Sequence, residues 1–93
     1  PFKDPSERKA YARQRREAIR QKFKQYKEFL TCIHCGESNP SCIDFHHKDP
    51  STKEFRLANC VSQGYSWERI LLEIAKCDVV CANCHRKLHS VML

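Results

Sequence analysis

Two Cys-x-x-Cys pairs constrain the fold of this chain more than any other feature of its sequence. Cys32 and Cys35 form the first pair, Cys81 and Cys84 form the second, and 45 residues lie between them. Two such pairs are typical of one tetrahedral zinc site that ties distant parts of a chain together. With 93 residues, of which 10% are aromatic, the chain can build only a modest core, so we expect a structural zinc ion to support its fold.

The number of cysteines weighs against a disulfide framework, which is the main alternative for a small chain of this kind. Seven cysteines cannot all pair, and their spacing is that of metal ligands. A redox role for one Cys-x-x-Cys pair is a weaker alternative. The remaining cysteines are predicted to be buried thiols, because free cysteine behaves as a small hydrophobic residue; they are Cys42, Cys60 and Cys77.

The chain carries no apolar run long enough for a signal peptide or a membrane span. Together with the zinc-type spacing of the cysteines, this predicts an intracellular protein without a membrane partner. The chain begins with Pro1 instead of Met, so we expect it to be a piece of a longer protein.

Residues 1–30 are predicted to form a basic helix appended to the zinc domain. Asp4 is placed as its N-cap, Pro5 falls in the first turn, and Glu7 can bond back to the cap. A narrow apolar stripe is expected to dock part of this helix, from residue 5 to about 30, on the rest of the chain. The stripe consists of Ala12, Ile19, Phe23, Tyr26 and Leu30.

The net charge of +6 lies entirely within residues 1–30. They hold ten of the 17 Lys and Arg residues but only four of the 11 Asp and Glu residues. Charge of one sign favours a polyanionic partner, so we predict contact with a nucleic-acid backbone. Arg13, Arg16 and Arg20 are spaced to share one face for this contact. The alternative is a solvated helix face without a partner.

Residues 31–93 are predicted to form one α+β domain. Residues 41–47 are β-branched and aromatic enough for a strand, and residues 48–60 have the composition of a loop. Residues 78–81 form a second short strand that leads into the second cysteine pair.

Two helices are expected in this domain. The first covers residues 64–77, with Ser66 as its cap and an apolar face in the core. That face consists of Ile70, Leu71 and Ile74. The second runs from Asn83 onward, with Asn83 as its N-cap.

Residues 48–77, between the two predicted strands, are an insertion that two pairs of histidines flank. Neighbouring residues on a strand point to opposite faces, so His46 and His47 in the stretch DFHHKDP serve different purposes. His85 and His89 are four residues apart, which places them on one face of the last helix. A zinc ion at the cysteines would hold both pairs in register.

Taken together, the motifs CIHC, DFHHKDP and CANCHRKLH resemble those of the HNH endonucleases, whose active site is a ββα-metal (His-Me finger) motif. The resemblance covers residues 32–89 and leaves the basic helix outside. It implies a small zinc-stapled domain over residues 31–93 with a second, catalytic divalent metal, such as magnesium or manganese. It also implies hydrolysis of DNA phosphodiester bonds, with nicking and double-strand cleavage both open, in the cytoplasm or nucleoid of a bacterial or phage-infected cell.

The resemblance further implies a role for each histidine. His46 and His85 would bind the catalytic metal, and His47 would be the general base that takes a proton from the attacking water. An imidazole suits this task because its ordinary pKa is about 6.5. His89 would either complete the metal site or bind a phosphate. Further candidates for phosphate contacts are Lys48, Arg86 and Lys87.

The middle asparagine of the family has no clear counterpart. Lys76 and Cys77 stand where it usually lies, so Asn83, Asn59 and the absence of this role are three alternatives. A different function class is also open, namely a zinc-stapled module that binds nucleic acid without cutting it. Both functions need the basic helix and the four cysteines, but only the nuclease needs a second metal and His47. The sequence leaves the oligomeric state open.

Overall fold

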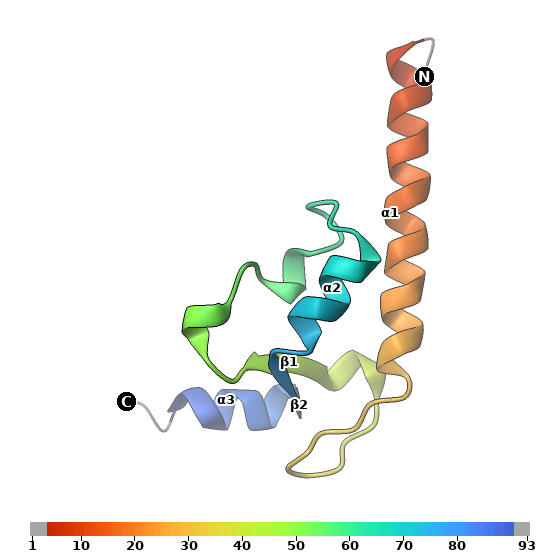
Figure 1. Cartoon of the computed structure of the whole chain (residues 1–93). Coiled ribbons are helices and arrows are strands. Elements are labelled where there is room, and N and C mark those ends of the chain that lie inside the picture. The colour runs from red at the N-terminus through yellow and green to blue at the C-terminus, as the bar shows by residue number, and fades with distance from the viewer. Residues whose placement is uncertain (1–3, 91–93) are drawn as a thin grey trace.

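The computed structural model describes residues 4–90, which form a small α+β fold with a long N-terminal helix (Figure 1). The helices and strands, in chain order, are α1 (Pro5–Lys27), β1 (Ile43–His47), α2 (Trp67–Ile74), β2 (Cys77–Cys81) and α3 (Ala82–Ser90). The α+β class predicted from the sequence is confirmed. The predicted last helix extended to residue 93, and its final three positions lie outside the described residues.

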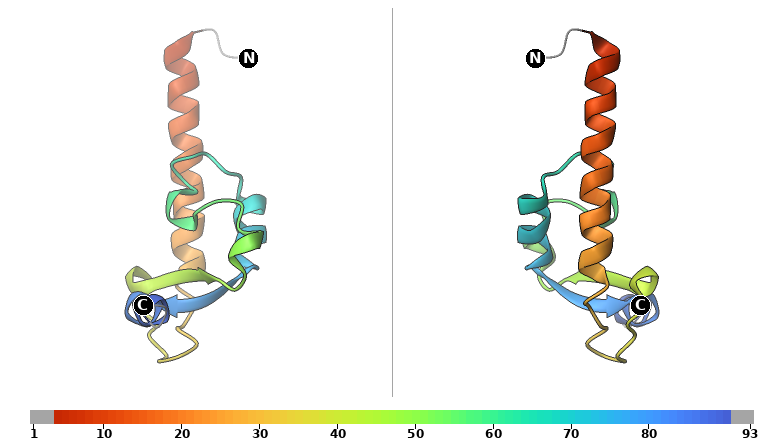
Figure 2. Two further views of the ribbon diagram at one scale, coloured as in Figure 1. Left: turned by 90° about the vertical axis from the view of Figure 1, so that its left-hand side faces the viewer. Right: turned by 90° about the vertical axis from the view of Figure 1, so that its right-hand side faces the viewer.

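Helix α1 begins as predicted. The side chain of Asp4 accepts a hydrogen bond from the backbone N–H of Glu7 at 3.0 Å, and Pro5 occupies the first turn. The helix ends at Lys27, with Glu28 as its C-cap, instead of near residue 30. Its N-terminal half extends beyond the rest of the molecule (Figures 1 and 2). With this helix included, the structure measures 53 × 28 × 20 Å.

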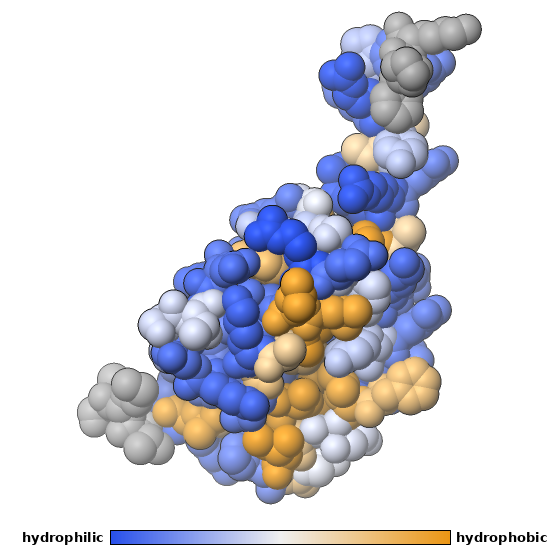
Figure 3. Space-filling view, in the orientation of Figure 1, coloured by the Kyte–Doolittle hydropathy of each residue, from blue (hydrophilic) through white to orange (hydrophobic). Residues whose placement is uncertain are grey.

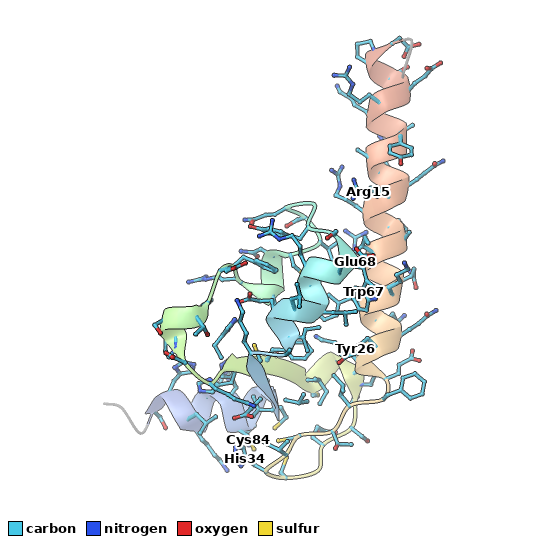
Figure 4. All side chains as sticks on the ribbon, viewed as in Figure 1. Arg15, Tyr26, His34, Trp67, Glu68 and Cys84 are labelled. Carbon is cyan, nitrogen blue, oxygen red and sulfur yellow. The ribbon has the colours of Figure 1, made fainter. Side chains whose placement is uncertain are left out.

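The C-terminal half of α1 packs on the rest of the fold through the predicted apolar stripe. Ile19, Phe23 and Tyr26 are half-buried against the core. The ring centroids of Phe23 and Tyr26 lie 6.3 and 5.8 Å from that of Trp67 on α2, and Phe23 lies 5.8 Å from Phe45 on β1. In Figure 4, Trp67 and Tyr26 occupy the space between α2 and α1. These aromatic contacts hold the helix against the domain.

The two strands pair antiparallel, in a register that places His46 opposite Asp78. Because side chains alternate along a strand, Asp44 and His46 share one face of β1, while Phe45 and His47 share the other. The first face contacts α3, and the second contacts α1 and α2. The sheet therefore separates the two neighbouring histidines, as the sequence predicts.

Helix α3 follows β2 without a loop. It begins at Ala82, so Asn83 lies inside its first turn and the prediction that Asn83 is the N-cap is wrong. Because β2 ends at Cys81, no loop residue is left to serve as a cap. The second cysteine pair thus spans the junction between a strand and a helix.

Helix α2 begins at its predicted cap, because the Ser66 hydroxyl accepts a backbone N–H bond at 3.3 Å. Ile70 and Ile74 are buried as predicted, but Leu71 is 36% exposed, so the prediction that it joins the core is wrong. Glu73 turns inward with the two isoleucines, and Leu71 lies on the neighbouring face. Among the described residues, Glu73 is the one buried charged side chain, at 1% exposed.

The core also draws on residues 48–60, which the sequence predicted as a plain loop. This segment contains two short 3₁₀ turns and buries Phe55, Leu57 and Cys60. Cys60 and Cys77 are buried as predicted, whereas Cys42 is only half-buried. The apolar cluster between α1, α2 and this segment consists of Phe55, Leu57, Cys60, Ile70, Ile74 and Cys77.

The surface of the free part of α1 is mostly hydrophilic (Figure 3). Over the described residues, the helices are all too short or too polar to cross a membrane. The basic side chains of this part of α1 are exposed to solvent.

Candidate metal centres

The four cysteines of the two pairs come together at one end of the sheet. Their Sγ atoms all lie within 4.8 Å of one another, and those of Cys35 and Cys81 are 3.6 Å apart. Cys32, Cys81 and Cys84 are buried, and Cys35 is exposed. In Figure 4, Cys84 lies close to the loop that carries the first pair. Four thiols at this spacing could hold a metal ion such as zinc.

Backbone N–H groups in both turns point at the sulfur atoms. The N–H of His34 donates to Cys32 Sγ at 3.4 Å, and the N–H of Cys84 donates to Cys81 Sγ at 3.3 Å. Gly36 allows the first turn to close, because its φ of +80° suits glycine. Such N–H···S bonds stabilise thiolates, which are the form that binds metal.

The thiols of the cluster do not ionise alike. Burial acts to raise the pKa of Cys32, but the N–H groups of Cys35, Cys81 and His34 outweigh it and lower that pKa to about 6. The contact with Cys81, together with burial, raises the pKa of Cys84 to about 12. Thiolates this close repel one another, so a cation is needed before all four can ionise.

Three histidines form a second cluster between β1 and α3. His46, His85 and His89 each offer a ring nitrogen within 4.8 Å of the others. The Nε2 atoms of His85 and His89 are 3.1 Å apart, and the ring centroid of His46 lies 5.2 and 5.4 Å from theirs. One turn of α3 separates the two helical histidines, as predicted. Cys84, a member of the first cluster, immediately precedes His85 in the chain.

The surroundings of this cluster favour the neutral form of His46. The pKa of His46 is lowered by burial and by the nearby charges of His85 and His89. Asp44 Oδ2 lies 3.2 Å from His85 Nδ1, so that nitrogen donates its proton and Nε2 is left to bind a ligand. Three imidazoles, one of them oriented by a carboxylate, are chemically suited to a divalent metal.

His47 occupies the opposite face of β1 and bonds to the buried carboxylate of α2. Its Nε2 lies 2.6 Å from Glu73 Oε2. The same carboxylate accepts from Lys76 Nζ at 3.0 Å and from the backbone N–H of Glu54 at 3.1 Å. Burial acts to raise the pKa of Glu73, but these donors outweigh it and lower the pKa. Glu73 is thus a carboxylate, and it fixes His47 with Nε2 as donor and Nδ1 as acceptor.

A cavity of about 320 Å³ opens beside both sets of histidines. It is lined by all four imidazoles and by two basic residues of the insertion, Lys53 and Arg56. These two cations and Glu73 were not predicted from the sequence. Glu73 did leave a signal, since it is a charged residue on the apolar face of α2. Lys53 and Arg56 left none, because their approach depends on how the insertion folds.

The structure does not bring every predicted residue to this cavity. Asn83 and Asn59 are exposed and line none of the cavities beside the histidines. Lys48 lies 3.8 Å from Asp78 across the sheet. Arg86 lines a separate open hollow with His85 and His89. The other predicted contacts are exposed on their helices: Lys87, Arg13, Arg16 and Arg20.

Comparison of the chain with protein-family models, with curated proteins and with solved structures finds no match in any of the three. The resemblance to the HNH endonucleases therefore rests on the motifs of this chain. The structure adds a small α+β fold whose four cysteines could hold a metal such as zinc.

Proposed function

We propose that the protein is a metal-dependent DNA endonuclease of the HNH type, with a ββα-metal active site formed by β1, β2 and α3. The observation that carries this proposal is the convergence of His46, His85 and His89 within 4.8 Å, next to His47 on the same strand. One imidazole of the strand then serves a metal, and its neighbour serves the attacking water. The four cysteines would hold a structural zinc ion, which leaves no open position for substrate.

The donor set of the histidine cluster fits a divalent transition metal. Imidazole nitrogen suits zinc, iron and nickel, whereas magnesium and manganese both prefer oxygen ligands. Of the latter two, manganese is the transition metal and accepts imidazole ligands more readily, so we expect it to support activity better than magnesium. A bound ion would polarise the scissile phosphate and stabilise negative charge on the leaving oxygen. Asp44 holds His85 in the orientation that presents Nε2.

His47 would act as the general base. Its Nε2–H is held by Glu73 at 2.6 Å, so Nδ1 keeps the lone pair that can accept a proton from water. The carboxylate also stabilises the imidazolium formed when that proton arrives, as carboxylate–histidine pairs do in other hydrolases. Lys76 and the backbone of Glu54 keep Glu73 in place.

The cations of the cavity would bind the substrate phosphates. Lys53 and Arg56 line the same cavity as the four imidazoles, so a phosphodiester placed there would meet both positive charge and base. The exposed basic face of α1, including Arg13 and Arg16, would add affinity that does not depend on sequence.

Cleavage of supercoiled plasmid DNA with added manganese or magnesium tests this function. We expect His47→Ala to lower the rate by about 100-fold or more, because general-base catalysis contributes about 10² to 10⁴. His34→Ala is the matched control, since His34 is an exposed histidine in the first cysteine turn. Equal rates for His47→Ala and the wild type would exclude His47 as the base.

A second function, nucleic-acid binding without cleavage, is favoured by one observation. The side chain of His47 is only 9% exposed, and its bond to Glu73 would also serve a purely structural role. Calorimetric titration with manganese separates the two functions. The nuclease needs a metal site that His46→Ala removes while zinc stays bound, whereas the binding module needs no second metal.

A further inference from the structure

A trough runs from the histidines along the C-terminal half of α1. A cavity of about 490 Å³ lies between α1 and residues 57–62. It shares Phe23 and Lys27 with a cavity of about 310 Å³ that reaches His47 and His85. These two histidines also line the cavity beside the histidine cluster. The three cavities therefore lie next to one another, and the row that they form, which we call the trough, extends from α1 to the proposed active site.

The charged residues that line the trough are nearly all cations, namely Arg20, Lys24, Lys27, Lys53 and Arg56. Among the described residues that line it, Asp44 is the one acid, and it is bonded to His85. Arg20 pairs with Glu17, whereas the other four cations form no ion pair with a described residue. The trough thus offers uncompensated positive charge.

The cations that α1 contributes belong to a longer stripe. Six basic residues follow one another at steps of three or four positions, so they share one helix face. They are Lys9, Arg13, Arg16, Arg20, Lys24 and Lys27. The C-terminal members line the trough, and the N-terminal half of the helix stands in solvent (Figure 2). The stripe therefore leads from solvent toward the histidines.

Apolar side chains lie among these cations. Phe23, Phe45, Leu57 and Val61 line the trough, and Lys27 Nζ lies 5.3 and 5.8 Å from the two phenylalanine rings. Cations interleaved with aromatic and apolar surface suit a single nucleic-acid strand, whose phosphates meet the cations and whose bases meet the apolar side chains. A double helix keeps its bases paired and would use only the charge.

We propose that this trough binds a single polynucleotide strand and leads it to the histidine cluster. The inference rests on the proposed nuclease function for its direction, but the binding itself needs no cleavage. A substrate with a single-stranded segment, or a duplex opened locally, would place one strand in the trough. The scissile phosphate would then lie beside Lys53, Arg56 and the imidazoles.

Fluorescence anisotropy of the zinc-loaded protein, without added manganese or magnesium, tests the inference. The probes are a labelled single-stranded DNA, the duplex of the same sequence and the corresponding RNA. The groove variant is Lys24→Ala with Lys27→Ala. The control is Arg8→Ala with Lys22→Ala, two exposed α1 cations that line none of the cavities described and remove the same charge.

We expect the wild type to bind a single strand, DNA or RNA, more tightly than the duplex. The groove variant should bind the single strand roughly tenfold more weakly at about 0.1 M salt, with a salt slope lower by about 1.4, because each phosphate contact contributes about 0.7. The control should change neither quantity. The DNA and RNA arms identify which strand the trough prefers.

The inference would be overturned if the groove variant and the control lost equal affinity for the single strand. It would also be overturned if the wild type bound the duplex at least as tightly as both single strands. Melting temperature and zinc content show whether either variant is misfolded. A protein that binds single strands through the trough but cuts nothing would refute the nuclease alone. A protein that cuts plasmid but shows equal losses would refute the trough alone.

Discussion

The cysteine cluster and the histidine cluster differ in what surrounds them. Both gather their ligand atoms within 4.8 Å and both draw on α3. The cysteine cluster has four ligands, three of them buried, and N–H groups point at its sulfur atoms. The histidine cluster has three ligands that are half-buried or exposed, beside a cavity of about 320 Å³. The cysteine cluster is therefore closed around its ligands, and the histidine cluster is open, with room for a reacting group. We call them the closed cluster and the open cluster.

The largest effect is expected at the closed cluster. Cys84→Ser should leave the protein unfolded or insoluble, because a structural zinc site contributes about 10 kcal/mol or more in small domains. Zinc content and the thermal unfolding transition measure this. Cys42→Ser is the matched control, since Cys42 is half-buried outside the cluster and its loss should leave one zinc per chain. A Cys84→Ser protein that is soluble, cooperative and zinc-free would contradict the structural role.

At the open cluster, loss of a ligand should abolish metal binding and cleavage but leave the fold intact. His85→Ala is expected to abolish manganese binding and plasmid cleavage, while zinc content stays at one per chain. Ser90→Ala, at an exposed position of the same helix, controls for damage to the helix. Calorimetry and zinc analysis on the same samples separate the two clusters. Loss of zinc together with manganese would show that the open cluster also supports the fold.

Glu73 tests how the base beside the open cluster is held. Glu73→Gln should destabilise the fold by about 2 kcal/mol, because a buried donor among Lys76, His47 and the Glu54 backbone loses its acceptor. Its amide can also turn His47 to the other tautomer, so we expect cleavage to fall with an altered pH profile. Glu68→Gln, an exposed residue of the same helix, should change neither property.

The pH dependence of that variant has a definite sign. The pKa of Glu73 is lowered in the fold, so its carboxylate stabilises the protein above the ordinary value of 4.5. The difference in melting temperature between wild type and Glu73→Gln should stay constant from neutral pH to about 5. It should shrink as the pH falls below 4.5 and through the lowered pKa. A difference that grows in acid would contradict the ionised state.

The smallest effect on either cluster is expected from the basic face of α1. Reversing Arg13, Arg16 and Arg20 to Glu should weaken DNA binding and lower the duplex salt slope by up to about 2.7. Zinc content and melting temperature should be nearly unchanged, because these side chains are exposed. If the triple variant kept the wild-type affinity and salt slope, this face of α1 would make no contact with DNA.

The two clusters were also unequally predictable from sequence. Cys32 and Cys84 belong to short-range pairs whose spacing alone indicates metal ligands, so the cysteine cluster could be predicted without knowledge of the fold. The histidine pairs could be assigned to opposite strand faces and to one helix face by periodicity. Their convergence depends on the pairing of β1 with β2, which sequence spacing does not determine.

What could not be predicted depends on tertiary packing. Leu71 was assigned to the core by its apolar character, but the fold buries Glu73 because His47, Lys76 and a backbone N–H converge on it. Asn83 has the composition of a cap, yet α3 starts directly from β2. In each case a long-range contact or a chain junction outweighed local preference.

Cys84 and His85 are neighbours in the chain, so one peptide bond joins a ligand of the closed cluster to a ligand of the open one. Occupancy of the two clusters should therefore be thermodynamically linked. Any factor by which zinc raises the affinity for manganese must equal the factor by which manganese raises the affinity for zinc. Because the histidine cluster depends on the fold that zinc would support, manganese would bind only the zinc-loaded protein, and activity would report on zinc supply as well as on the metal at the histidines.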